Sequence, residues 1–183
     1  MRIGAVIVLM TFPLTTGAHR IDEYLQAARL SLALDRIVLK MDLTPGIDVA
    51  PLIFARINTN RDGRISEAEG RVYANHVLEE IVLEVDGKPL HLDLVSAHFP
   101  SFEEMSAGTG VIRIEARAAW TGGAGRHSLF YKNNHTPDFG AYLVNALVPA
   151  SPEIEISDQH RDALQREFRL TFKVVALSRG LRG

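Results

Sequence analysis

The chain has no cysteine among its 183 residues. Disulfides, thiolate metal sites and cysteine nucleophiles are therefore excluded, although an oxidising compartment is not. Aromatic residues make up only 7% of the chain, and the formal net charge is -2 with a pI of about 6.4. Without a basic field, the sequence gives no reason to expect a nucleic-acid partner. The rest of the composition, 46% apolar and 23% charged, is typical of one globular domain with at most a small insertion.

Long apolar runs are also scarce, and the clearest one lies at the N-terminus. Met1 and Arg2 are followed by an apolar stretch from Ile3 to about Leu14 and by the small residues Thr16-Gly17-Ala18. This is the pattern of a signal peptide, and it is shorter than the roughly 20 residues that span a bilayer. We predict a signal peptide over residues 1–18 and a periplasmic or secreted mature protein that is not an integral membrane protein. The alternative is a retained N-terminal anchor.

Cleavage near Ala18 would make His19 the first residue of the mature chain. A free α-amine and the adjacent imidazole can together chelate copper or nickel, which accept nitrogen ligands. The sequence offers no clear second ligand, so His19 is equally well explained as a polar residue beside the cleavage site.

The most informative stretch runs from Asn58 to Glu69 and reads NTNRDGRISEAE. A calcium ion takes about 6–8 oxygen ligands, which a twelve-residue loop supplies from positions 1, 3, 5, 7, 9 and 12 around a glycine at position 6. Gly63 occupies that glycine position, and Ile65 is the apolar residue expected to pin the loop to the protein. The ligand positions hold Asn58, Asn60, Asp62, the backbone carbonyl of Arg64, Ser66 (through water) and Glu69.

This stretch resembles the calcium loop of EF-hand proteins at every ligand position except the first. The motif prefers Asp there, whereas this chain has Asn58, which keeps an oxygen but lacks the charge. With only Asp62 and Glu69 charged, we expect weak Ca²⁺ binding, with a dissociation constant of about 10⁻⁴–10⁻³ M. The alternative is a polar turn between two helices that holds no ion.

The residues around the loop predict a helix-loop-helix insertion over residues 47–80. Residues 48–57 fit a short entering helix that Asp48 could cap, and 66–80 fit an exiting helix with Val72 on its buried face. Only one such loop exists in the chain. Because EF-hands commonly pair, this one is expected to lean on another part of the protein.

The rest of the chain alternates apolar and polar residues with period two, as half-buried strands do. A tight turn at Asp35-Arg36, the hairpin signal Asp86-Gly87 and a turn at 158–162 separate some of these strands. We predict an immunoglobulin-like β-sandwich over residues 19–176, mostly β and interrupted by one EF-hand helix-loop-helix, with a frayed tail at 177–183. The expected strands cover about 30–34, 37–43, 81–85, 89–97, 111–120, 127–132, 142–148, 153–157 and 166–175, with a turn of helix at 102–105.

Three further stretches, at 18–27, 142–149 and 161–168, resemble the exported N-terminal region of bacterial membrane proteins related to hydrogenase and urease accessory proteins. Those proteins are linked to nickel and cobalt transport. The resemblance covers about residues 18–175, but no polytopic transport domain is present in this sequence. It implies an exported domain that works as a periplasmic adaptor or as a nickel- or copper-binding module for a membrane transporter. This is the alternative to the calcium hypothesis.

Other patterns are weaker. His91 and Asp93 share one side of a strand, and His135 and Asp138 share the polar loop 133–140. Each pair has the spacing of a binding site, but solvent-facing residues or a self-satisfied turn explain it equally well. The glycines of 122–125 read as a flexible turn, and the chain has no zinc-protease, nucleotide-binding or nucleophile-elbow motif. We therefore do not expect an enzyme, and a hydrolase with its site in loop 133–140 is the least supported alternative.

Overall fold

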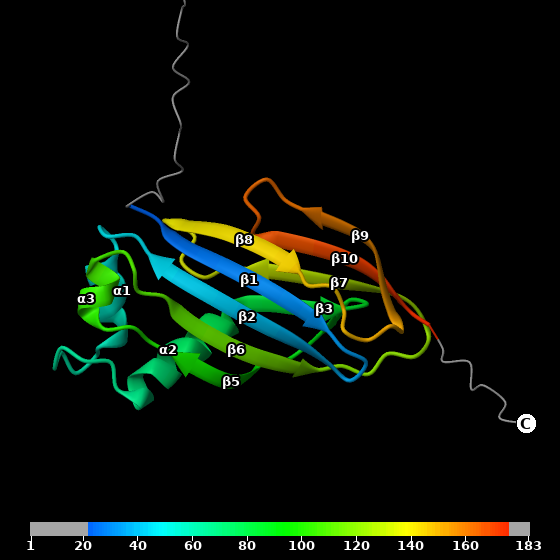
Figure 1. Ribbon diagram of the computed structural model, residues 1–183, viewed down its shortest axis with the longest axis horizontal. Coiled ribbons are helices and arrows are strands. Elements are labelled where there is room, and N and C mark those ends of the chain that lie inside the picture. Colours follow the sequence, from blue (N-terminus) through cyan, green and yellow to red (C-terminus); the bar gives the residue numbers. More distant parts are fainter. Residues whose placement is uncertain (1–21, 176–183) are drawn as a thin grey trace, which may run out of the picture.

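The computed structural model describes residues 22–175 as a sandwich of two five-stranded β-sheets with three short helices (Figure 1). In spatial order, one sheet contains β5 (Asp93–His98), β6 (Ile112–Ala119), β2 (Arg36–Pro45), β1 (Tyr24–Leu32) and β8 (Gly140–Ala146). The other contains β4 (Lys88–Pro89), β3 (Ile81–Val85), β7 (Gly125–Asn133), β10 (Glu167–Val174) and β9 (Ile154–Arg161). The helices are α1 (Ala50–Ile57), α2 (Glu67–Glu79) and α3 (Phe102–Ser106).

The strand order is that of an immunoglobulin-like domain, in which strands A, B, E and D form one sheet and C, F and G the other. Here β1, β2, β6 and β5 take the first four places, and β3, β7 and β10 take the other three. Two strands are inserted in the sequence between β7 and β10. Strand β8 lies parallel to β1, and β9 extends the other sheet beyond β10. The predicted fold class is confirmed.

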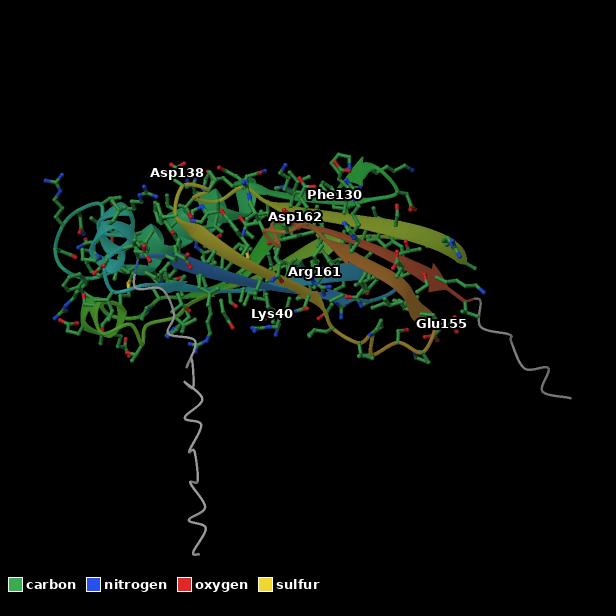
Figure 2. All side chains as sticks on the ribbon, turned by 90° about the horizontal axis from the view of Figure 1, so that it is seen from above. Lys40, Phe130, Asp138, Glu155, Arg161 and Asp162 are labelled. Atoms are coloured by element: carbon green, nitrogen blue, oxygen red, sulfur yellow. The ribbon has the colours of Figure 1, made fainter. Side chains whose placement is uncertain are left out.

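Period-two alternation builds the core. Along β1, every second residue from Tyr24 to Leu32 is buried, and the antiparallel register with β2 places Leu30 opposite Leu39. Charged side chains such as Lys40 and Asp42 of β2 take outward positions. Figure 2 shows Lys40 and Phe130 on opposite outer faces of the sandwich. The Asp86-Gly87 hairpin is also confirmed, since both residues have the positive φ that a type I′ turn requires, +52° and +72°.

Three details of the strand prediction are wrong. The first strand, expected at about 30–34, is β1 and already begins at Tyr24. Residues 158–161 are not a turn, because β9 continues through them and pairs with β10, for example His160 with Arg169. As an edge strand with most residues exposed, β9 lacks the apolar alternation that identifies a half-buried strand. The expected strand at 89–97 is split into β4 and β5, which belong to different sheets.

The helix-loop-helix prediction is confirmed, with α1 and α2 lying between β2 and β3. The expected cap at Asp48 is wrong, because Val49 occupies the N-cap of α1 and makes no side-chain capping bond. Of the residues expected along one face of α2, Tyr73 and Val77 are buried, but Val72 is 70% exposed, so its placement was wrong.

The three helices gather at one end of the sandwich (Figure 1). There α1 meets α3 through the rings of Phe54 and Phe102, whose centroids are 4.8 Å apart. The α2 helix packs on β5 and β3, and a Cβ at its buried Gly70 would lie 2.6 Å from the ring of Phe99. The loop between β7 and β8 reaches the same end. The single helix-loop-helix therefore packs on the sandwich.

Within residues 22–175, none of the helices has the length and apolar character needed to cross a membrane. The predicted signal peptide at 1–18, His19 and the predicted tail at 177–183 lie outside the described residues.

Candidate metal centre

The predicted calcium loop connects the end of α1 directly to the start of α2. Asn58 is the C-cap of α1 and Ser66 is the N-cap of α2. Between them the backbone turns at Gly63, with φ +83°, in the left-handed region that favours glycine. Arg61 also has a positive φ, +60°, which is unusual for a residue with a Cβ. Ile65 packs against the core, as expected of the pinning residue.

Glu69 joins the two ends of this loop. Its Oε1 accepts from the Thr59 hydroxyl at 3.0 Å and from the Asn60 backbone N–H at 3.1 Å. Its Oε2 accepts from the Ser66 hydroxyl at 2.7 Å and from the Ser66 N–H at 3.0 Å, and Ser66 in return caps the Glu69 N–H. These bonds, led by that from the Ser66 side chain, lower the pKa of Glu69 to about 2. The carboxylate at position 12 is therefore charged and held in place.

Asn60 connects the two carboxylates. Its backbone N–H binds Glu69, and its side-chain amide donates to Asp62 Oδ2 at 3.1 Å. Asp62 Oδ1 in turn accepts from the Arg64 N–H at 2.8 Å, and the Asp62 N–H donates to Asn60 Oδ1 at 3.0 Å. Positions 3, 5, 9 and 12 thus form one connected group.

Asn58 is the exception, and it is the most informative residue of the loop. Its side chain is buried, with the residue only 5% exposed, yet Oδ1 has no hydrogen-bond partner. A buried amide oxygen without a partner costs about 1–3 kcal/mol. Asn58 is position 1 of the predicted loop, where a calcium ion would take that oxygen as a ligand.

The donor set fits a hard cation. It consists of carboxylates, side-chain amides, a hydroxyl and a main-chain carbonyl, which are the oxygens that Ca²⁺ takes. A carboxylate has about four acceptor sites, and those of Glu69 are filled by four donors. For Glu69 to bind an ion, the hydroxyls of Thr59 and Ser66 must rotate away from it. Both hydroxyls are free to rotate, and both are exposed.

A buried polar chain lies beside this loop, on the same helix. The hydroxyl of Tyr24 in β1 lies 3.0 Å from that of Tyr73 in α2, which lies 3.1 Å from His135 Nε2. His135 Nδ1 bonds the carboxylate of Glu80, the C-cap of α2. Because a carboxylate only accepts, Nδ1 carries the proton and Nε2 accepts from Tyr73. His135 is 2% exposed, and its burial lowers its pKa against the opposing effect of Glu80.

The backbone around His135 is fixed by a second set of bonds. The Gln26 amide donates to the His135 carbonyl at 3.0 Å, Asn133 Oδ1 accepts from the His135 N–H at 2.9 Å, and the Tyr142 hydroxyl donates to the same carbonyl at 2.8 Å. Loop 133–140 is therefore anchored to both sheets and to α2. Asp138, expected to act with His135, is exposed and lies at the helical end of the molecule (Figure 2).

Sequence reasoning missed this chain because each member is ordinary by itself. One signal was present in the sequence. Gln26 lies in phase with Tyr24, Ala28 and Leu30, so a polar side chain points inward from a half-buried strand. Such a residue needs a buried partner, which Asn133 and loop 133–140 supply.

The remaining candidate sites are less organised. His91 and Asp93 are 3.6 Å apart with largely exposed side chains, as expected for the solvent-facing alternative. In the 122–125 glycine run, Gly122 leaves room for the ring of Trp120, where a Cβ would lie 2.1 Å away. The carbonyl of Gly123 bonds His127 Nε2 at 2.9 Å, and the other ring nitrogen of His127 bonds Asp86 at 2.7 Å.

Over the described residues 22–175, no group of three or more His, Asp or Glu side chains is placed to hold a metal ion. The predicted calcium loop needs no such group, because it uses two carboxylates and neutral oxygens. His135 has both ring nitrogens bonded within the protein, so it has no lone pair free for nickel or copper. Compared with known protein families, curated proteins and solved structures, the chain has no match.

Proposed function

We propose that this protein binds Ca²⁺ at the loop from Asn58 to Glu69 and that the ion fixes α1 and α2 against the β-sandwich. The observation that carries the proposal is the buried Oδ1 of Asn58, which has no partner and stands at the first ligand position. The glycine bend at Gly63 and the charged, positioned carboxylate of Glu69 support it. The ligand set is Asn58, Asn60, Asp62, Arg64, Ser66 and Glu69.

The binding is expected to be weak. Only two ligands are charged, and the hydroxyls of Thr59 and Ser66 must give up their bonds to Glu69. Weak calcium sites suit surroundings where the ion reaches millimolar levels, such as those outside the cell. The proposal therefore includes the predicted export, which depends on residues 1–18, and a role as an interaction domain. No observation favours the nickel or copper alternative, because His19 lies outside the described residues and His135 is already bonded.

The first test is thermal unfolding of the full chain with excess Ca²⁺ and with a chelator. Binding to the folded state alone stabilises it by about 2.7 kcal/mol when calcium is 100-fold above the dissociation constant. We expect a clear rise in melting temperature with calcium. An unchanged melt would overturn the proposal.

The matched variants are Glu69→Gln and Glu67→Gln. Gln at position 69 still serves a capping box, so α2 keeps its N-cap while the loop loses a charged ligand. Glu67 is two residues away, exposed, and pairs only with Arg71 at 3.3 Å. Calcium should no longer raise the melting temperature of Glu69→Gln, and should raise that of Glu67→Gln as in the wild type. Equal responses from both variants would place the ion elsewhere.

A further inference from the structure

The helix that carries a calcium ligand at one end is bonded twice to a buried histidine. Glu69 lies in the first turn of α2, Tyr73 one turn later, and Glu80 at its C-cap. Tyr73 and Glu80 bond the two ring nitrogens of His135, which comes from the loop between β7 and β8. The hydrogen bonds of one imidazole therefore add to the packing on β5 and β3 in holding α2 on the sandwich.

These bonds require His135 to be neutral. A second ring proton on Nε2 would force Tyr73 to accept instead of donate, so its own proton would turn towards Tyr24. Tyr24 would then need another acceptor for its hydroxyl proton. It is fully buried, and among the described residues Tyr73 is the one hydrogen-bond partner of that hydroxyl. Protonation of His135 therefore leaves an unpaired buried donor or breaks the bond to α2.

The groups around His135 shift its pKa in both directions. Burial lowers its pKa, and the nearby side chains of His76 on α2 and Arg56 on α1 lower it further. The Glu80 carboxylate opposes them. The remaining titratable groups that face the ring are Tyr73 and Tyr24, with rings at 5.8 and 5.9 Å, and Tyr142 of β8, which bonds its carbonyl. Burial raises the pKa of Tyr73 to about 12, so this hydroxyl keeps its proton.

We propose that the chain Tyr24–Tyr73–His135–Glu80 makes calcium binding at the loop 58–69 sensitive to pH, with protons and calcium competing through α2. This inference rests on the proposed calcium function. The neutral chain holds α2 on the sandwich, and protonation of His135 loosens the helix whose first turn positions Ser66 and Glu69. With a pKa of about 2, Glu69 itself does not titrate near neutral pH.

Coupling between two sites is reciprocal, so calcium binding must also drive the proton off His135. Such coupling commonly changes affinity by about 5–150-fold. Calcium titration by calorimetry of the full chain, at about pH 7.5 and about pH 5.5 on either side of the ordinary histidine value, measures it. We expect the affinity to fall at least about fivefold at the lower pH. In the titration at the lower pH, buffers of different ionisation enthalpy should reveal proton release on calcium binding.

Three variants locate the effect. His135→Gln offers one donor and one acceptor without a charge change, so it should bind calcium with equal affinity at both pH values. If His135→Gln does not fold, Tyr73→Phe takes its place in the experiment. It breaks the hydrogen-bonded chain while leaving His135 in the protein, and it should weaken the pH dependence. His76→Gln tests the neighbouring histidine, which lies 3.9 Å from Glu80 and has its ring 6.3 Å from that of His135. It should keep the pH dependence but shift it to higher pH, because a group that lowers the pKa of His135 is removed.

The outcomes separate the two proposals. Calcium binding of equal affinity at both pH values, or pH dependence that disappears in His76→Gln and remains in His135→Gln, overturns the coupling and leaves the calcium site standing. Failure of the wild-type chain to bind calcium at either pH overturns both.

Discussion

Strand β7 has one histidine near its start and another just beyond its end, and the pKa values of the two are shifted in opposite directions. At the end away from the helices, both ring nitrogens of His127 face acceptors, the carboxylate of Asp86 and the carbonyl of Gly123. The hydrogen bond to Asp86, followed by that to Gly123, raises the pKa of His127. At the helical end, His135 faces one acceptor and one donor in a buried site, and burial lowers its pKa. The partners of the ring nitrogens, together with burial, therefore decide in which direction the pKa of the same residue type is shifted.

The largest expected effect is the loss of the shared hydroxyl at the helical end. Tyr73→Phe leaves the Tyr24 hydroxyl and His135 Nε2 without their partners in a buried site. Each unpaired buried group costs about 1–3 kcal/mol, so the loss of both partners should lower the free energy of unfolding by about 2–6 kcal/mol. Urea unfolding at neutral pH without calcium measures it. Tyr142→Phe, which removes a single donor to the His135 carbonyl, is the control and should cost less. If Tyr73→Phe lowers the free energy of unfolding no more than the control does, the hydrogen-bonded chain from Tyr24 to Glu80 is not important for stability.

The second prediction compares the pH dependence of the two ends. The folded pKa of His135 lies below its unfolded value of about 6.5, so the stability it contributes is present above that pH and is lost as the pH falls. The stability difference between wild type and His135→Gln should therefore be largest in mild alkali and shrink in acid. The folded pKa of His127 is raised, so its contribution is fully present below about pH 6.5 and is lost as the pH rises through the folded value.

His127→Gln should consequently show the reverse profile, with its largest deficit in acid. Urea midpoints of the two variants and the wild type across this range give the comparison. Two profiles with the same slope would show that the two histidines do not differ in the way their contacts indicate.

The smallest expected effect is at the partly exposed pair of Asp86 and His127. Asp86→Asn keeps an oxygen for the Ser128 N–H but removes the charge beside His127. Asp86 is 44% exposed in its side chain, so solvent screens the pair and the loss in acid should be about 0.2–1 kcal/mol. Calcium affinity should not change, because distant sites act independently. A calcium response altered by Asp86→Asn would show that the two ends communicate.

The sandwich could be predicted because its information is local. Alternation from Ile37 to Leu43, the Asp86-Gly87 turn and the loop spacing from Asn58 to Glu69 each fix their own backbone. The parallel pairing of β1 with β8 brings together residues more than a hundred positions apart, such as Tyr24 and Gly140. No local pattern specifies such a pairing.

The candidate site was only partly predictable for the same reason. The ligand types and their order are written in the loop, but the buried state of Asn58 depends on how α1 and α2 pack. Glu69 was expected to be available to the ion, whereas it also joins Thr59 and Asn60 to Ser66. His135 was expected in a polar turn and is instead at the centre of a buried chain, because its partners come from β1 and α2.

Arg161, at the end of β9, has a consequence for the outer edge of the molecule. Its Nε donates to the Val144 carbonyl of β8 at 2.6 Å and its Nη2 to Asn145 Oδ1 at 2.8 Å, which connects the edges of the two sheets (Figure 2). A strand from a neighbouring molecule that approached β8 would have to displace a guanidinium before it could pair there. The side chain that joins the two sheets therefore also makes it harder for another molecule to pair with the edge strand β8.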